Sequence, residues 1–213
     1  MAVLLYSNEA NAQAGFSLGA GDLDGDKLPD LVVGAVGHAK SGNAVGAAWV
    51  VLGSYLAKQT PQPWEDGVAP ANKPALLDPN GGNLAVEGEL AGERLGSAVA
   101  VVPRPGGKGF AGVAVGSPLG AVGGTLFSGG VLVFRYVAAG AAVGLQTAPA
   151  LALAGESVPA LGRIGDFLHM GVVAGKPWLA VGGPLGTPAT GVNGAPAVDI
   201  GTVYAMPLGD LKP

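Results

Sequence analysis

Short apolar segments alternate with glycine-containing turns along the whole chain. Residues 31–37 (LVVGAVG), 113–120 (VAVGSPLG) and 179–186 (LAVGGPLG) each place an apolar run before a glycine and a small residue. Short apolar runs bounded by turn residues are typical of β-strands. The 39 glycines are spread throughout the sequence, and each would cost a long helix roughly 1 kcal/mol. The pattern therefore predicts an all-β protein.

The apolar segments belong to a threefold internal repeat. Val115 and Val181 are 66 positions apart, and so are Gly96 and Gly162, while Gly15 stands at the corresponding place in the first repeat. Further strand candidates flank these landmarks at residues 2–7, 83–89 and 151–156 and at residues 46–53, 129–136 and 201–209. Four short strands per repeat of roughly 65 to 80 residues predict the blades of a β-propeller. A β-sandwich of unrelated strands is the alternative, but it would not explain the constant offset.

We expect the chain to be a single propeller unit over residues 1–213, with three four-stranded blades. The repeats are placed approximately at residues 10–89, 90–156 and 157–213, and residues 55–83 form a long insertion in the first. Three blades are too few to close a ring, because propellers typically have four to eight.

The ends of the chain suggest how the ring closes. Residues 2–7 match the fourth strand of a blade and residues 201–209 match a third strand. We therefore predict that residues 2–7 are a swapped closing strand that completes the last blade of a second chain, giving a six-bladed ring of two chains. The alternatives are that a different protein supplies the missing blades or that the chain is a piece of a longer propeller.

Composition and charge exclude several classes. Apolar residues make up 49% of the chain and charged residues only 12%, whereas disordered chains are polar and rich in charge. The net charge is −4 without a basic patch, which argues against a nucleic-acid partner. The absence of cysteine removes disulfides and thiolate chemistry and leaves the redox compartment undetermined.

The sequence also predicts no membrane span. The uncharged residues 109–134 are long enough to cross a bilayer. Because several glycines and Pro118 interrupt them, they are better explained as short strands and turns. The first residues, MAVLLYSNEA, lack the basic region and the longer apolar run of a signal peptide.

An acidic loop is the most specific chemical feature of the sequence. Asp22, Asp24, Asp26 and Asp30 lie within nine positions, and such crowded carboxylates repel one another unless a cation neutralises them. Spacing 1, 3, 5, 9 is typical of loops that wrap calcium, in which a backbone carbonyl at position 7, here that of Leu28, is a further ligand. A solvated acidic turn is the alternative.

At this loop the chain resembles the FG-GAP repeats of integrin α-subunits and their bacterial relatives. The first repeat reads GFSLGAGDLDGDKLPDLVVGAV, and the later repeats end in GSP and GGP. The resemblance implies a calcium-stabilised propeller outside the cell, in the periplasm or on the cell surface. Lys27 departs from it by replacing the glycine usual at position 6. The other two repeats lack the carboxylates, so we expect one calcium ion per chain.

Enzyme signals are weak. GFSLG at residues 15–19 fits the nucleophile-elbow pattern around Ser17, but that pattern needs a strand, a turn and a helix, and the repeat predicts a strand here. Any imidazole base must be His38 or His169, and we interpret both as polar loop residues. We therefore predict a protein that is not an enzyme.

The long insertion is the candidate partner-binding surface, because loops on a rigid scaffold commonly carry binding. Trp64, Glu65 and Asp66 lie in its polar, proline-rich part. We expect them to bind a protein partner, with adhesion or scaffolding as the function. A carbohydrate-binding propeller, or the propeller part of an extracellular hydrolase or lyase, is the alternative function, and a packed loop without a binding role is the alternative for the insertion.

Overall fold

The structure is a computed structural model, and it describes most of the chain. The described residues are 3, 5–59, 75–76, 84–102, 111–121, 128–137, 144–154, 163–184 and 201–208. All but a few of the regular elements among them are β-strands.

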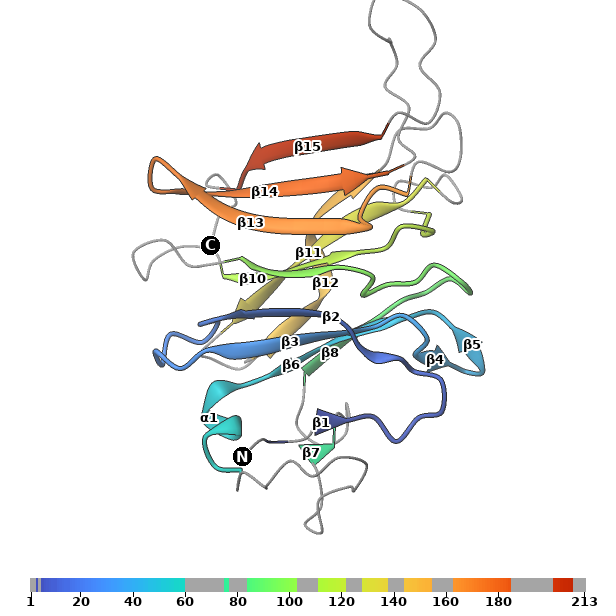
Figure 1. Cartoon of the computed structure of the whole chain (residues 1–213), viewed down its shortest axis with the longest axis vertical. Helices are drawn as coiled ribbons and strands as arrows, with labels where there is room; N and C mark the ends of the chain where they lie inside the picture. The colour runs from blue at the N-terminus through green and yellow to red at the C-terminus, as the bar shows by residue number, and fades with distance from the viewer. Residues whose placement is uncertain are drawn as a thin grey trace, which may run out of the picture.

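Three antiparallel sheets follow one another along the chain (Figure 1). The first sheet has the order β2 (Ala14–Gly21), β3 (Asp30–Ala35), β6 (Ala47–Val51), β8 (Leu84–Glu87). The second runs from β9 (Val99–Val102) through β10 (Gly112–Gly116) and β11 (Gly130–Val137) to β12 (Gly144–Ala154). The third contains β13 (Phe167–Val173), β14 (Lys176–Gly183) and β15 (Thr202–Pro207).

Small elements complete the first third of the chain. β1 (Leu5–Tyr6) pairs in parallel with β7 (Ala75–Leu76), and β4 (Ala39–Lys40) pairs with β5 (Asn43–Ala44). A four-residue helix, α1 (Gly53–Leu56), follows β6 directly.

The sheets pack face to face on two apolar layers. The layer between the first and second sheets contains Val32 and Val50 on one side and Val113 and Val115 on the other, all almost fully buried. A second layer joins the second sheet to Leu179 and other residues of the third. The first strands of the three sheets, β2, β9 and β13, come together along the middle of the molecule. This is how blades are arranged in a propeller, where inner strands surround a common axis.

The prediction of an all-β fold made of propeller blades is confirmed. The first two sheets are four-stranded, and the third has three strands within the described residues. The described parts of the three sheets are stacked face to face and do not close a ring (Figure 1). Within the predicted closing strand, Leu5 and Tyr6 pair with Ala75 and Leu76 of the same chain. Pairing with a second chain stays a prediction, as do the repeat boundaries.

One predicted landmark is wrong. The structure places Gly165 rather than Gly162 at the position equivalent to Gly96, because Leu95 and Ile164, the residues just before them, make equivalent bridges to the preceding blade. The shift arises in the hairpin between β13 and β14. There Ala174 and Gly175 have φ of 49° and 76°, the geometry of a tight two-residue hairpin turn, so the third repeat reaches its second strand in fewer residues.

The prediction that no segment spans a membrane concerns the helices of the chain. No helix in the part of the chain that the structure describes is long and apolar enough to cross a bilayer. Within residues 109–134, the described segments contribute β10 and the start of β11.

Candidate metal centre in the first blade

The acidic loop connects β2 to β3 at one end of the first sheet. Two of its residues, Gly25 and Lys27, have positive φ, 87° and 72°. Lys27 therefore adopts the left-handed conformation that glycine supplies without strain, at a cost of roughly 1–2 kcal/mol for a residue with a side chain. The loop keeps its tight path despite this substitution.

Carboxylates hold the loop by accepting backbone hydrogen bonds. The Oδ1 atom of Asp22 accepts from the N–H of Gly25 at 2.6 Å, and its Oδ2 atom accepts from Lys27 at 3.1 Å. The Oδ1 atom of Asp24 accepts from the N–H of Asp26 at 3.0 Å. Aspartate side chains commonly close turns by bonding to the backbone two residues ahead. The side chains that could bind a cation therefore also determine the shape of the loop.

Asp30 anchors the loop from below. It is fully buried, and its Oδ2 atom accepts from the N–H of Leu23 at 2.6 Å, while Oδ1 accepts from the N–H of Gly53 at 2.8 Å. Gly53 is the first residue of α1, and its backbone packs closely on the residue before Asp30. A Cβ on Gly53 would be 2.6 Å from the carbonyl oxygen of Pro29. Asp30 thus ties the acidic loop to the segment that follows β6.

Three of the predicted ligands come together. Oxygen atoms of Asp22, Asp24 and Asp30 all lie within 4.8 Å of one another. Calcium–oxygen distances are about 2.3–2.6 Å, so two ligands of one ion can be no more than about 5 Å apart, and these three residues fit a shared cation. Asp26 lies outside this group, and its Oδ1 atom accepts from the N–H of Leu28 at 2.7 Å. Asp26 and the carbonyl of Leu28 remain predicted ligands.

The electrostatic environment of the loop disfavours negative charge. Burial raises the pKa of Asp24, and the neighbouring carboxylates of Asp30, Asp26 and Asp22 act in the same direction. The effect extends to the second blade, where burial and the charges of Asp24, Asp30 and Asp26 raise the pKa of Tyr136 to about 12. A bound cation would relieve this repulsion.

The other predicted residues have different outcomes. Trp64, Glu65 and Asp66 lie outside the described residues. Ser17 lies within β2, and its hydroxyl donates to the carbonyl oxygen of Gly96 at 2.7 Å. This hydrogen bond joins the first blade to the second, a structural role for the serine.

The sequence missed a second polar cluster in the same blade. His38 is buried, with Nδ1 2.6 Å from Oε2 of Glu9 and Nε2 3.0 Å from Oε1 of Glu87. The imidazole ring also meets the edge of Trp49, with 5.3 Å between ring centroids. His38 lies in the loop between β3 and β4, as predicted, although the sequence did not indicate its buried contacts. The interpretation of His169 as a loop residue is wrong, because His169 lies in β13. No local signal could reveal the cluster, because its carboxylates come from distant parts of the sequence.

Acidic and basic side chains come together in this second cluster. The hydrogen bond with His38 lowers the pKa of Glu87, and the charges of His38 and Lys40 lower it further. The Nζ atom of Lys40 is 3.5 Å from Oε2 of Glu87. The N–H of Ala39 donates to Oε1 of Glu9 at 2.6 Å. The cluster joins the segment before β2 to β8, the last strand of the blade.

Strands β2, β3 and β6, with the aspartate-rich loop between β2 and β3, form a blade of the propeller type. Residues 14–51, which span these strands, match the family model described as the FG-GAP repeat. The chain therefore contains an FG-GAP repeat, and the predicted resemblance is confirmed at the repeat where its motif is most complete. A search of curated proteins finds no match to the sequence.

Proposed function

We propose that the chain is a non-enzymatic β-propeller module that mediates protein–protein interaction, in adhesion or scaffolding, and that one calcium ion stabilises its first blade. The proposal places the protein outside the cell, in the periplasm or on the cell surface, as expected of FG-GAP proteins. The observation that supports it best is the convergence of Asp22, Asp24 and Asp30 within an FG-GAP repeat.

Calcium would act on stability through the native loop alone. Asp30 comes to the cluster from a buried position, whereas Asp22 and Asp24 come from the loop itself. These three carboxylates meet only when the loop is folded, so a cation that bridges them binds the folded state. Such a ligand adds about 2.7 kcal/mol at a hundredfold excess over its Kd.

Thermal unfolding with calcium and with EDTA tests the proposal. We expect the midpoint to be higher with calcium, and Asp24→Asn to reduce the difference because it removes one charged ligand. Glu89→Gln is the matched control, since Glu89 is exposed and lies outside the acidic loop. An identical midpoint in calcium and EDTA for the unaltered chain would refute calcium stabilisation.

A further inference from the structure

Neighbouring blades are joined by the same backbone junction at both sheet–sheet contacts. In the first junction Leu95 forms a parallel bridge with Gly46, and in the second Ile164 forms the equivalent bridge with Gly129. Gly46 and Gly129 both have positive φ, 84° and 71°, and both are packed against the backbone of the bridging residue. Each blade therefore presents a glycine, just before its third strand, to the blade that follows it.

The following blade contributes a turn that fits into this junction. Gly96 and Gly165 come immediately after the bridging residues and have φ of 89° and 96°. A Cβ on Gly96 would collide with the carbonyl oxygen of Ala47 in β6, and one on Gly165 would collide with that of Gly130 in β11. The turn is thus packed directly on the third strand of the blade before it.

The first blade has the same turn, and no described residue of another blade packs against its glycine. Gln13 and Gly15 have φ of 55° and 92°, which repeats the values of 59° and 89° at Arg94 and Gly96. Among the described atoms, however, none lies within 4 Å of the position that a Cβ on Gly15 would occupy. The first blade therefore carries one half of a junction without its counterpart.

An exposed leucine accompanies this unmatched turn. Leu18 stands three residues after Gly15, as Val99 stands three residues after Gly96. Val99 is 6% exposed and belongs to the apolar layer between the first and second sheets, whereas Leu18 is 62% exposed. The difference follows from the junction, because the first blade covers Val99, whereas no blade in the described part of the chain covers Leu18.

The third blade carries the other half of the junction. Gly201 has φ of 75° and stands just before β15, as Gly46 and Gly129 stand before β6 and β11. The described atoms nearest to its Cβ position belong to Pro184 and Gly183, which are in its own blade. Among the described residues, none occupies the place that Leu95 and Ile164 fill in the two complete junctions.

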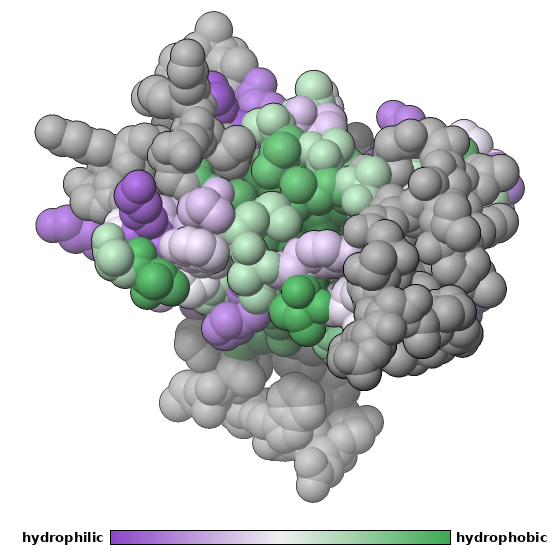
Figure 2. Space-filling view, turned by 90° about the horizontal axis from the view of Figure 1, so that it is seen from above, coloured by the Kyte–Doolittle hydropathy of each residue, from purple (hydrophilic) through white to green (hydrophobic). Residues whose placement is uncertain are grey.

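The outer face of the third sheet, beside Gly201, is apolar and exposed. Three rows cross it in register, namely Phe167, Gly182 and Val203, then His169, Ala180 and Ala205, then Gly171, Trp178 and Pro207. Phe167 is 66% exposed and Val203 is 78% exposed. From above, on the side where β15 lies in Figure 1, hydrophobic residues gather between the parts drawn in grey (Figure 2). Exposed apolar surface of this kind is typical of interaction sites.

We propose that the outer face of the third sheet binds the first blade of a second copy of this chain, with the turn at residues 13–15 packed beside Gly201. The two internal junctions indicate what fits there, namely a turn ending in a positive-φ glycine and followed by an apolar residue three positions on. The described part of the chain offers one unmatched turn of this kind, with Gly15 and Leu18. The inference rests on the proposed function as an interaction module and names its partner.

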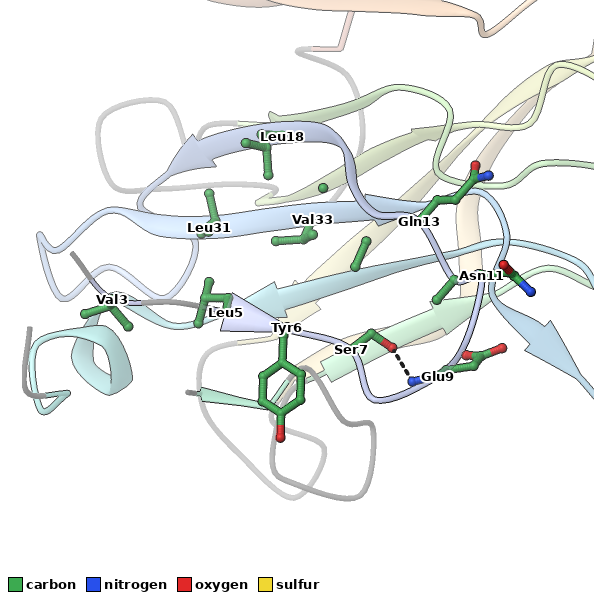
Figure 3. A pocket seen from close by; sticks show the side chains of 13 residues that line it. Val3, Leu5, Tyr6, Ser7, Glu9, Asn11, Gln13, Leu18, Leu31 and Val33 are labelled. Carbon is green, nitrogen blue, oxygen red and sulfur yellow. Dashed lines mark hydrogen bonds between the residues drawn. The ribbon is translucent and has the colours of Figure 1, made fainter. Parts of the chain in front are cut away.

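β1 must move for this contact to form. Leu5 of β1 packs on an apolar cluster that includes Val33 and Trp49, on the side of the first blade that a preceding blade would cover. A cavity of about 520 Å³ remains between β1 and Leu18, Leu31 and Val33 (Figure 3). Within the described residues β1 pairs with β7 at two positions, and we expect the displacement of β1 to make association slow.

Multi-angle light scattering over a range of concentrations, in calcium, tests the contact. We expect a mass about twice the 20.6 kDa of the chain, and a monomer for Leu18→Lys and for Val203→Lys. Both side chains are largely exposed in the single chain, so neither substitution should unfold it, and circular dichroism checks this. Leu90→Lys is the control, because Leu90 is also exposed but lies outside both halves of the junction.

Mixing the two variants tests the direction of the contact. In a mixture, the unaltered Leu18 of the Val203→Lys chain can meet the unaltered Val203 of the Leu18→Lys chain, so one of two junctions remains intact. We expect partial recovery of the dimer on mixing. A dimer that persists in Leu18→Lys alone would overturn the proposal in favour of a symmetric contact between two third sheets.

A mass of 20.6 kDa at every concentration would also overturn the proposal. Thermal unfolding of the same samples with calcium and EDTA separates the two ideas. A monomer whose midpoint still rises with calcium would refute the junction between copies and leave the calcium-stabilised module standing. If calcium does not change the midpoint but the unaltered chain is a dimer that both variants abolish, calcium stabilisation would be refuted and the junction between copies would stand.

Discussion

The two ends of β3 are stabilised by opposite electrostatic arrangements. At its start, Asp30 gathers with Asp22 and Asp24, and within the described residues no ion pair joins a basic side chain to any of them. Shortly after its end, His38 lies between Glu9 and Glu87. The first cluster contains only carboxylates, which all come from residues 22–30. The second cluster brings acidic and basic side chains together from three distant segments of the chain. One blade thus contains a cluster in which acidic side chains meet basic ones, and a cluster of carboxylates that no basic side chain among the described residues pairs with.

Removal of the Asp30 carboxylate should lower the free energy of unfolding more than any other change at the two clusters. Asp30→Ala leaves the buried N–H groups of Leu23 and Gly53 without their acceptor, and an unsatisfied buried group costs about 1–3 kcal/mol. We expect the free energy of unfolding to fall by about 3 kcal/mol in EDTA, measured by chemical denaturation. Asp26→Ala, in the exposed part of the loop, should cost less than about 1 kcal/mol by the same rule. Equal losses would show that Asp30 has no special anchoring role.

At the other end of β3, His38→Ala should cost less than Asp30→Ala. The substitution removes two charge-assisted hydrogen bonds and the contact with Trp49, but Glu9 and Glu87 are partly exposed and can recover water. Hydrogen bonds to charged groups contribute about 1.5–3 kcal/mol each before this compensation, so we expect a net loss of about 2 kcal/mol. Lys58→Ala is the control, because Lys58 is exposed and lies outside the cluster, and it should change the stability little. A loss at His38 no larger than at Lys58 would contradict a stabilising role of the His38 cluster.

The contrast between the clusters also separates what the sequence can predict from what it cannot. The acidic loop is a local pattern, and its spacing alone predicted a site at which Asp22, Asp24 and Asp30 meet. The apolar segment at residues 46–53 was predicted as a strand, and Trp49 within it is almost fully buried. Periodicity and turn residues act over a few positions, so the sheets they form could be predicted as well.

Contacts between distant segments could not be predicted. His38 depends on Glu9 and Glu87, which reach it only through the pairing of β6 with β8 and the path of the segment before β2. Likewise the placement of the third landmark glycine failed because the length of one hairpin turn shifts Gly165 against the repeat. The periodicity of a single sequence does not show how long each hairpin turn is. It also does not show which charged residues meet across the fold.

Acid should weaken the His38 cluster. The hydrogen bond with His38 lowers the pKa of Glu87, so folding favours its charged form. This contribution to stability is present above the ordinary pKa of a glutamate and is lost as the pH falls through the lowered value of the folded state. We expect the difference in unfolding free energy between the unaltered chain and Glu87→Gln to shrink as the pH is lowered into that range. A difference that stays constant with pH would show that the charge on Glu87 does not contribute.

Lys27 offers the smallest change and the most direct test of how the acidic loop is built. Its φ of 72° costs a residue with a Cβ roughly 1–2 kcal/mol, but glycine also gives the unfolded chain more freedom, worth about 0.4–1 kcal/mol. Lys27→Gly should therefore raise the free energy of unfolding by less than about 1 kcal/mol. Gly25→Ala, at φ of 87° in the same loop, should lower it, because the strain is added rather than removed. If Lys27→Gly destabilises the protein instead, the lysine side chain must interact favourably with the carboxylates around it. The acidic loop would then resemble the His38 cluster, in which basic side chains of the chain itself meet the carboxylates.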